Sequence, residues 1–173
     1  MNDKIRLFFA LWPDQITRQS IVEQTKPLLI NIPNKIIPDN LHITLAFVGS
    51  VEKSQLPCLL KAARFIQTKR FTLSLDKTGC FHQEKIFWLG CQFINPELKN
   101  LVTQLNNELK RCDYKPDERL YTPHVSLARQ YNSLSYPEFK NKIEWQVDSF
   151  SLIESRSTAA GVEYHVLDTW PLN

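Results

Sequence analysis

Residues 41–49 have the sequence LHITLAFVG, an apolar run bounded by turn-forming residues that is typical of a β-strand. Side chains alternate across a strand, so His42 and Thr44 are expected to share one face. The opposite face is apolar and is made by Leu41, Ile43, Leu45 and Phe47. Burial against a core explains the apolar face, whereas the histidine and the hydroxyl need a different explanation.

A second segment repeats this pattern. Residues 123–128, PHVSLA, resemble residues 41–46, LHITLA, about eighty positions earlier in the chain. His124 and Ser126 again share a face, and Val125 and Leu127 take the other. We therefore expect two lobes that each contribute one such strand to a shared site. The alternative is a pair of core histidines, each hydrogen-bonded to a neighbouring hydroxyl.

The composition fits a folded domain. The chain has 173 residues, of which 43% are hydrophobic and 23% are charged, so it is long enough to form one domain with a sizeable core. Its formal net charge of +3 permits an anionic substrate but is too small for a protein that coats duplex nucleic acid.

The four cysteines, Cys58, Cys80, Cys91 and Cys112, form no CxxC pair and no cluster with a histidine. Structural zinc is therefore not expected, and we predict free, partly buried thiols in a reducing compartment. The first 14 residues have only a very short apolar core, and no apolar stretch is long enough to span a membrane. These features predict a cytoplasmic protein that does not enter the membrane.

Strand and helix patterns are mixed. Strands are predicted at residues 5–11, 41–49, 71–76, 85–93, 120–129, 144–155 and 161–170. Helices are predicted from Pro13 to about residue 29, over residues 52–67, and from Pro96 to about Cys112 with Asn95 as the N-cap. Because these elements do not alternate as regular βαβ units, we predict an α+β fold with largely antiparallel sheets.

Two facing imidazoles, each with a nearby hydroxyl, suit general acid–base chemistry near neutral pH, because one can be neutral while the other is protonated. Thr44 and Ser126 could donate hydrogen bonds to oxygens that gain charge during the reaction. A phosphodiester would use all of these groups, whereas an ester or amide would need a nucleophile motif that the chain lacks. Arg129 could bind a phosphate, or it could be a solvated surface arginine.

The two tetrads, HITL at residues 42–45 and HVSL at residues 124–127, resemble the H-x-[ST]-x motifs of the two-histidine (2H) phosphoesterase superfamily. The flanking stretches are similar to its RNA 2',3'-cyclic phosphodiesterase branch, also called 2'-5' RNA ligase (LigT-like). Those stretches are RLFFALWP (6–13), FWLG (87–90), TPHVSLAR (122–129) and SLIES (151–155). The resemblance implies one bilobal domain over residues 1–173, with two mostly antiparallel sheets facing a central cleft and helices on the outer faces.

The resemblance also implies an activity: hydrolysis, without metal or cofactor, of 2',3'-cyclic phosphates at RNA ends or in nucleoside 2',3'-cyclic phosphates, leaving a 2'-phosphate. By this resemblance His42 is the proton donor and His124 the proton acceptor, while Thr44, Ser126 and Arg129 bind the phosphate. Ser126 departs from the threonine common at its position, and it lacks the χ1 stiffness of a β-branched residue. A monomer is expected.

Three other readings stay open. The chain could be a non-catalytic module that binds RNA ends, although binding alone needs no pair of proton-transfer groups. It could be a 2H phosphodiesterase that acts on another cyclic nucleotide. It could also form 2'-5' linkages, since ligation reverses the same reaction.

Several other residues are candidates for smaller roles. His82 is expected to be a surface turn residue, and His165 is expected to be a structural residue of a strand. Of Phe8, Phe9 and Trp12, any could stack on a nucleobase, but core packing is expected for at least two. A basic rim for the RNA backbone could come from Lys4, Arg6, Lys69, Arg70 and Lys85, or these side chains could simply solvate the surface.

Overall fold

The computed structural model describes residues 3–159 and 161–173, and it confirms the predicted α+β fold with antiparallel sheets. The described residues form three α-helices: α1 (Gln15–Thr25), α2 (Leu56–Ala63) and α3 (Pro96–Leu109). They also form β1 (Lys4–Leu11), β2 (Ile43–Glu52), β3 (Phe71–Leu75), β4 (Lys77–Phe81), β5 (Ile86–Gly90), β6 (His124–Arg129), β7 (Ile143–Val147), β8 (Ser149–Thr158) and β9 (Gly161–Pro171). Short 3-10 helices are η1 (Lys26–Leu29), η2 (Pro38–Asn40), η3 (Lys53–Gln55) and η4 (Lys110–Cys112).

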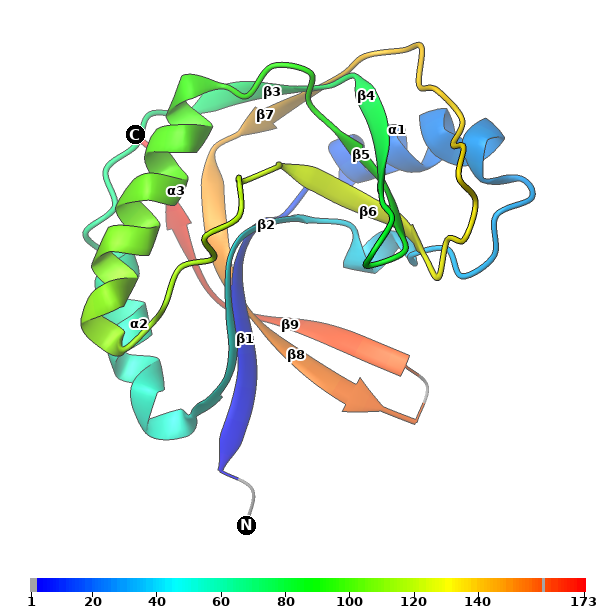
Figure 1. Ribbon diagram of the computed structural model, residues 1–173. Coiled ribbons are helices and arrows are strands. Elements are labelled where there is room, and N and C mark those ends of the chain that lie inside the picture. The colour runs from blue at the N-terminus through cyan, green and yellow to red at the C-terminus, as the bar shows by residue number, and fades with distance from the viewer. Residues whose placement is uncertain (1–2, 160) are drawn as a thin grey trace.

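Seven strands form one antiparallel sheet in the order β4-β5-β6-β2-β1-β8-β9, while β3 and β7 form a separate two-stranded sheet. The large sheet has two halves, and the ladder between β2 and β6 consists of one residue pair, Ile43 with Val125. From this contact β4, β5 and β6 extend to one side of the molecule while β1, β8 and β9 extend to another (Figure 1). The two histidine tetrads therefore meet where the halves join.

The helices cover the sheets and complete the core. Asn95 caps α3 as predicted, with its side-chain oxygen accepting from the Glu97 N–H at 2.8 Å. The stripe of α3 that faces the core is Leu98, Leu101, Val102, Leu105 and Leu109. α2 packs beside α3, whereas α1 lies on the other side of the molecule (Figure 1). Among the described residues, no helix combines the length and apolar character needed to cross a bilayer.

Some predicted element boundaries are wrong. The helix predicted over residues 52–67 covers only Leu56–Ala63, because β2 continues to Glu52. The strand predicted from residue 120 starts at His124, since Pro123 has no N–H to donate to a ladder. The strand predicted over residues 144–155 is two strands, β7 and β8, in different sheets on either side of Asp148. Alternation of apolar residues does not mark the point where a chain changes sheets.

The prediction of four free thiols is wrong for one pair. Cys58 in α2 and Cys112 in η4 form a disulfide across 54 positions. The sequence does not indicate which helices pack together, so this proximity could not be foreseen. Cys80 and Cys91 are free, and burial raises the pKa of Cys91 to about 12, so that thiol stays protonated. The cysteine pattern therefore gives no support for a reducing compartment.

Candidate active site

Each histidine tetrad contains a β-bulge at its leucine. In the first copy, Thr44 pairs with Ala10 of β1 and Ala46 pairs with Phe9, so Leu45 is the extra residue. Leu45 and Ala46 are both buried, which interrupts the alternation predicted from the sequence. The side chains that follow therefore change face.

The second copy has the same irregularity. Ser126 pairs with Trp88 of β5 and Ala128 pairs with Phe87, so Leu127 is the extra residue. Leu127 and Ala128 are both buried. The two copies thus share a local backbone shape as well as a sequence pattern.

Because of the bulges, one residue after each tetrad also points its side chain into the site. Phe47 was expected on the apolar face, but it is 52% exposed and lines the same cleft as His42 and Thr44. Arg129 lies three positions after Ser126 and would point away from it in a regular strand, yet the bulge brings it into this cleft too. Phe47 and Arg129 occupy equivalent positions, each five residues after its histidine.

The pairing of Ile43 with Val125 also sets how the copies face each other. Both of these side chains are fully buried, so the other face of each tetrad points out of the core, as predicted. When the antiparallel register is extended by one residue on either side, His42 lies opposite Ser126 and Thr44 lies opposite His124. In this register each histidine and the hydroxyl residue of the other copy occupy neighbouring positions on the same face.

A cleft of about 550 Å³ opens on this face. His42, Thr44, Ser126 and Arg129 line it, and His124 lies close enough that its charge acts on His42. His124 does not line the cleft itself; its ring contacts Phe81 with centroids 4.8 Å apart. The remaining lining residues are Arg6, Phe8, Lys35, Ile36, Ile37, Asn40, Phe47, Ser155, Ser157, Gly161, Val162 and Tyr164, and they include no carboxylate.

Backbone carbonyls fix the protonation pattern of both rings. The Nδ1 atom of His42 lies 2.7 Å from the carbonyl oxygen of Asn40, and Nδ1 of His124 lies 2.8 Å from that of Thr122. A carbonyl can only accept, so Nδ1 carries the proton in each ring. Nε2 is then the atom of each imidazole that can take up or release a proton.

Aromatic rings surround His42, and this burial lowers its pKa. Trp12 stacks on it at 5.5 Å with an interplanar angle of 12°, Phe8 lies at 4.9 Å, and Tyr164 meets it edge-on at 5.3 Å. Burial lowers the pKa of His42 to about 4; the Asn40 carbonyl opposes this, and the charges of His124 and Arg129 add to it. With this pKa, His42 is neutral at pH 7.

His124 has a similar environment. Trp88 lies 6.2 Å from its ring, beyond the contact with Phe81. Burial lowers the pKa of His124, the Thr122 carbonyl opposes this, and the charge of Arg129 lowers it further. Two imidazoles and a guanidinium that repel one another as cations form a site that an anion would stabilise.

Two side chains that sequence reasoning missed hold the backbone of the site. The Tyr121 hydroxyl donates to the Thr44 carbonyl at 3.0 Å, which ties the segment before His124 to β2. The Asn40 side chain donates to the Val162 carbonyl at 3.0 Å, while its own carbonyl accepts from His42. Asn40 could have been noticed from its place two residues before His42, but nothing in the sequence marks Tyr121.

The other aromatic and histidine residues considered from the sequence lie in the core, in a turn or in a strand. Phe9 is fully buried and Phe8 is buried against His42, whereas Trp12 is only half-buried. His82 is exposed in a turn, as expected. His165 is half-buried in β9 with Nε2 3.5 Å from a Glu163 oxygen. Within residues 3–159 and 161–173, no three His, Cys, Asp or Glu side chains gather as a metal-binding group.

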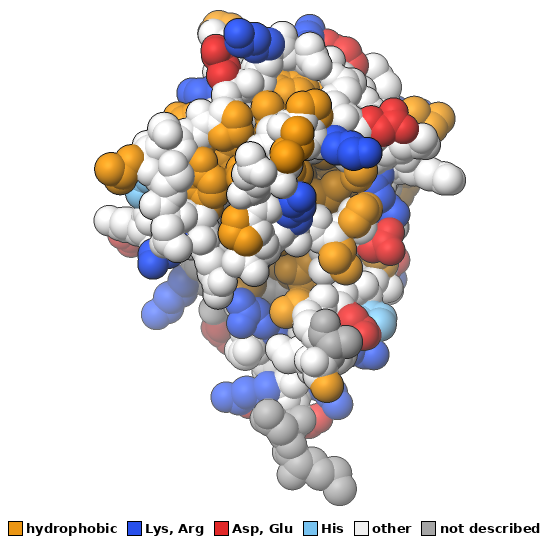
Figure 2. Space-filling model, turned by 90° about the vertical axis from the view of Figure 1, so that its right-hand side faces the viewer, with side chains coloured by type: hydrophobic (Ala, Val, Ile, Leu, Met, Phe, Trp, Pro, Cys, Tyr) orange, Lys and Arg blue, Asp and Glu red, His pale blue; other side chains and the backbone are white. Residues whose placement is uncertain are grey.

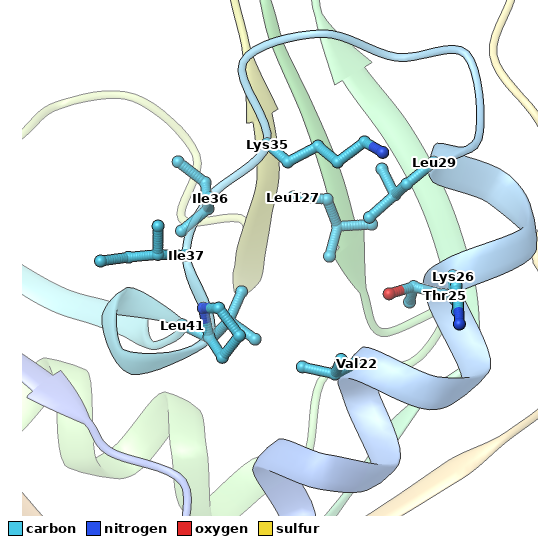
Figure 3. Close-up of a pocket in the computed structure, with 10 residues that line it drawn as sticks. Val22, Thr25, Lys26, Leu29, Lys35, Ile36, Ile37, Leu41 and Leu127 are labelled. Carbon is cyan, nitrogen blue, oxygen red and sulfur yellow. The ribbon is translucent and has the colours of Figure 1, made fainter.

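A second cavity, of about 430 Å³, lies next to the cleft (Figure 3). It is mainly apolar, with Val22 and Leu29 from the α1–η1 region facing Leu41 and Leu127 (Figure 3). The segment of residues 35–37 separates it from the cleft and lines both. The Lys35 side chain runs across this cavity toward Leu29 (Figure 3).

Comparison with known proteins gives the family. The model of the 2'-5' RNA ligase superfamily matches residues 13–159, and the chain belongs to this superfamily. It is 29% identical to the RNA 2',3'-cyclic phosphodiesterase of Escherichia coli K12, with 99% of each chain covered. It is 26% identical to the protein of the same name from Methanocaldococcus jannaschii, covering 96% of this chain and 100% of that one.

Solved structures of E. coli LigT have the same fold as this chain. The crystal structure of E. coli LigT complexed with 3'-AMP superposes with a TM-score of 0.90 at 27% identity, covering 98% of this chain and 99% of that one. The apo form of E. coli LigT gives a TM-score of 0.88 at 27% identity, covering 99% of both chains. The recognised resemblance to the LigT-like family is thereby confirmed.

Proposed function

We propose that this protein hydrolyses RNA 2',3'-cyclic phosphate ends to 2'-phosphomonoesters, with His42 and His124 as acid and base. The observation that carries this is the pair of imidazoles with matching Nδ1–carbonyl contacts. His42 lines a cleft with Thr44, Ser126 and Arg129 and without a carboxylate, and His124 lies close enough for its charge to act on His42. Relatives that match nearly the whole chain are named RNA 2',3'-cyclic phosphodiesterase, which supports the same activity.

The proposed reaction uses both imidazoles, both hydroxyls and the guanidinium of Arg129. Nε2 of neutral His124 accepts a proton from water as the water oxygen bonds to phosphorus. The bond between phosphorus and the 3'-oxygen breaks, and protonated His42 gives its Nε2 proton to that oxygen. Thr44 and Ser126 donate hydrogen bonds to the non-bridging oxygens, and Arg129 offsets their charge. The products are a 2'-phosphate and a free 3'-hydroxyl, and solvent exchange restores both imidazoles.

The lowered pKa of His42 fits this role once substrate is bound. The phosphodiester brings a negative charge close to the ring, and a nearby anion raises the pKa of an imidazole. His42 therefore takes up a proton as the substrate binds, and the acid forms only where it is needed.

The nucleobase is assigned to the exposed ring of Phe47. The ribose carries the leaving oxygen next to His42, so its base lies over the β2 side of the cleft. Phe47 is the exposed aromatic ring of β2 there, and Tyr164 of β9 also lines the cleft. Stacking on such rings is tolerant of base identity. Phe9 is fully buried and Phe8 is only 3% exposed, so Phe47 is the better-placed candidate base platform. Half-buried Trp12, which stacks on His42, stays a candidate.

The proposal needs no metal ion or cofactor, and its test follows from that. Purified protein with a nucleoside 2',3'-cyclic phosphate in EDTA should give the nucleoside 2'-phosphate, identified by chromatography against 2'- and 3'-phosphate standards. Turnover that requires an added divalent metal, or release of the 3'-phosphate, would contradict the mechanism. Tight binding of phosphate-ended RNA without product would favour the non-catalytic module instead.

Two further expectations stay predictions. They are that the protein is a cytoplasmic monomer and that it catalyses 2'-5' ligation as the reverse reaction.

A further inference from the structure

The cleft extends beyond the catalytic groups along β1. Phe8 contacts His42, and Arg6 lies two residues away on the same strand face. Arg6 pairs directly with Ser155 of β8, and Ser157 lies two residues further along β8. All four side chains line the cleft. An arginine and two hydroxyls therefore form its far end.

Arg6 differs from other cations near this end of the molecule. Lys4 pairs with Glu52 at 3.7 Å, and Arg156 pairs with Glu154 at 2.7 Å. Across residues 3–159 and 161–173, Arg6 has no carboxylate partner, and its guanidinium lies 4.9 Å from the centroid of the Phe47 ring. That contact holds the guanidinium plane in place without neutralising its charge. A guanidinium flanked by hydroxyls is suited to a phosphate.

The position of Arg6 indicates which phosphate it would bind. Two residues along a strand span about 7 Å, so Arg6 lies roughly that far from the level of Phe8 and His42. Neighbouring phosphates along a single-stranded RNA backbone are separated by a similar distance. With the cyclic phosphate between the tetrads and the base on Phe47, the 5' side of the terminal ribose faces Arg6.

We propose that Arg6, Ser155 and Ser157 form a second phosphate subsite, which binds the phosphodiester on the 5' side of the terminal nucleotide. This inference rests on the proposed function and narrows its substrate class: the preferred substrate is an oligonucleotide end, not a free nucleoside 2',3'-cyclic phosphate. In this arrangement Arg129 binds the reacting cyclic phosphate, and Arg6 binds the phosphodiester on its 5' side.

The test compares two substrates that differ by one internucleotide phosphate and nucleoside, uridine 2',3'-cyclic phosphate and the dinucleotide UpU with a 2',3'-cyclic end. The wild-type protein should have the higher kcat/KM on the dinucleotide. In Arg6→Gln the ratio of the two kcat/KM values should fall about tenfold, as expected for the loss of one charge-assisted contact. Lys4→Gln removes a cation from the same strand outside the cleft, and should leave the ratio unchanged. An Arg6→Gln variant with an unchanged ratio would overturn the subsite.

Binding of the products separates this inference from the proposed function. Calorimetry should give tighter binding of UpU 2'-phosphate than of uridine 2'-phosphate, with the difference lost in Arg6→Gln and partly kept in Arg6→Lys. The dinucleotide should also lose affinity more steeply as salt rises. If the wild type shows this binding difference but hydrolyses neither substrate, the subsite stands and the proposed function fails. Equal affinity for both products would reject the subsite.

Discussion

At the scale of single residues, the site depends on two histidines with the same backbone contact and different surroundings. A carbonyl fixes Nδ1–H in each, so the proton chemistry of both occurs at Nε2. His42 is enclosed by Phe8, Trp12 and Tyr164, and burial lowers its pKa to about 4. The substrate must therefore supply the negative charge that protonates it.

Replacing either histidine with asparagine should remove activity while keeping the local structure. The Asn side-chain N–H can still donate toward the carbonyl that Nδ1 contacts, but the variant lacks the proton-transfer atom Nε2. His42→Asn and His124→Asn should each lose about 10²- to 10⁴-fold in kcat on a nucleoside 2',3'-cyclic phosphate. His82→Asn, in an exposed turn, is the matched control. Near wild-type rates in either site variant would refute the acid–base assignment.

Anion binding should depend on pH through His42. Its pKa is about 4 in the protein alone, and a bound anion raises it, so anion binding is accompanied by uptake of a proton between those two pKa values. Affinity for sulfate, whose own charge is constant over this range, should therefore increase as pH falls from 7 toward 5, by up to about tenfold per pH unit. Calorimetric titrations of the wild type and of His42→Asn measure this. An equal pH dependence in both proteins would show that another group takes up the proton.

At the scale of elements, the paired bulges explain what sequence alone could and could not predict. Alternation correctly placed His42 with Thr44 and His124 with Ser126, because each pair precedes its bulge. It misplaced Phe47, which follows one. A bulge shifts the strand register by one residue, so the side chains that follow it change face. Because no residue type in an apolar run identifies a bulge, this change could not be predicted from the sequence.

The disulfide between α2 and η4 should stabilise the fold without affecting the chemistry. Neither Cys58 nor Cys112 lines the cleft. The double variant Cys58→Ser with Cys112→Ser should lose about 2–4 kcal/mol in the free energy of unfolding, measured in urea, while kcat/KM stays unchanged. Cys80→Ser, at a free thiol, is the control. Equal stability of the double variant and the wild type, both without reductant, would argue against the disulfide.

At the scale of the whole molecule, two halves of one sheet join at the Ile43–Val125 pair, and the site lies on that junction. On the side of the molecule shown in Figure 2, hydrophobic side chains gather in the upper and central part, with a few Lys and Arg groups among them. The α+β class was predictable from the mixed pattern of strands and helices. The division at Asp148 and the Cys58–Cys112 pair were not, because both depend on which elements pack together in space.

The most direct test of the central claim is a crystal structure of the protein with inorganic phosphate. The account predicts one phosphate between the tetrads, with Nε2 of His42 and of His124 on opposite sides of phosphorus and the Thr44 and Ser126 hydroxyls each within hydrogen-bond distance of an oxygen, about 3 Å. A phosphate bound elsewhere while this position holds only water, or imidazoles that turn away from a phosphate bound there, would contradict it.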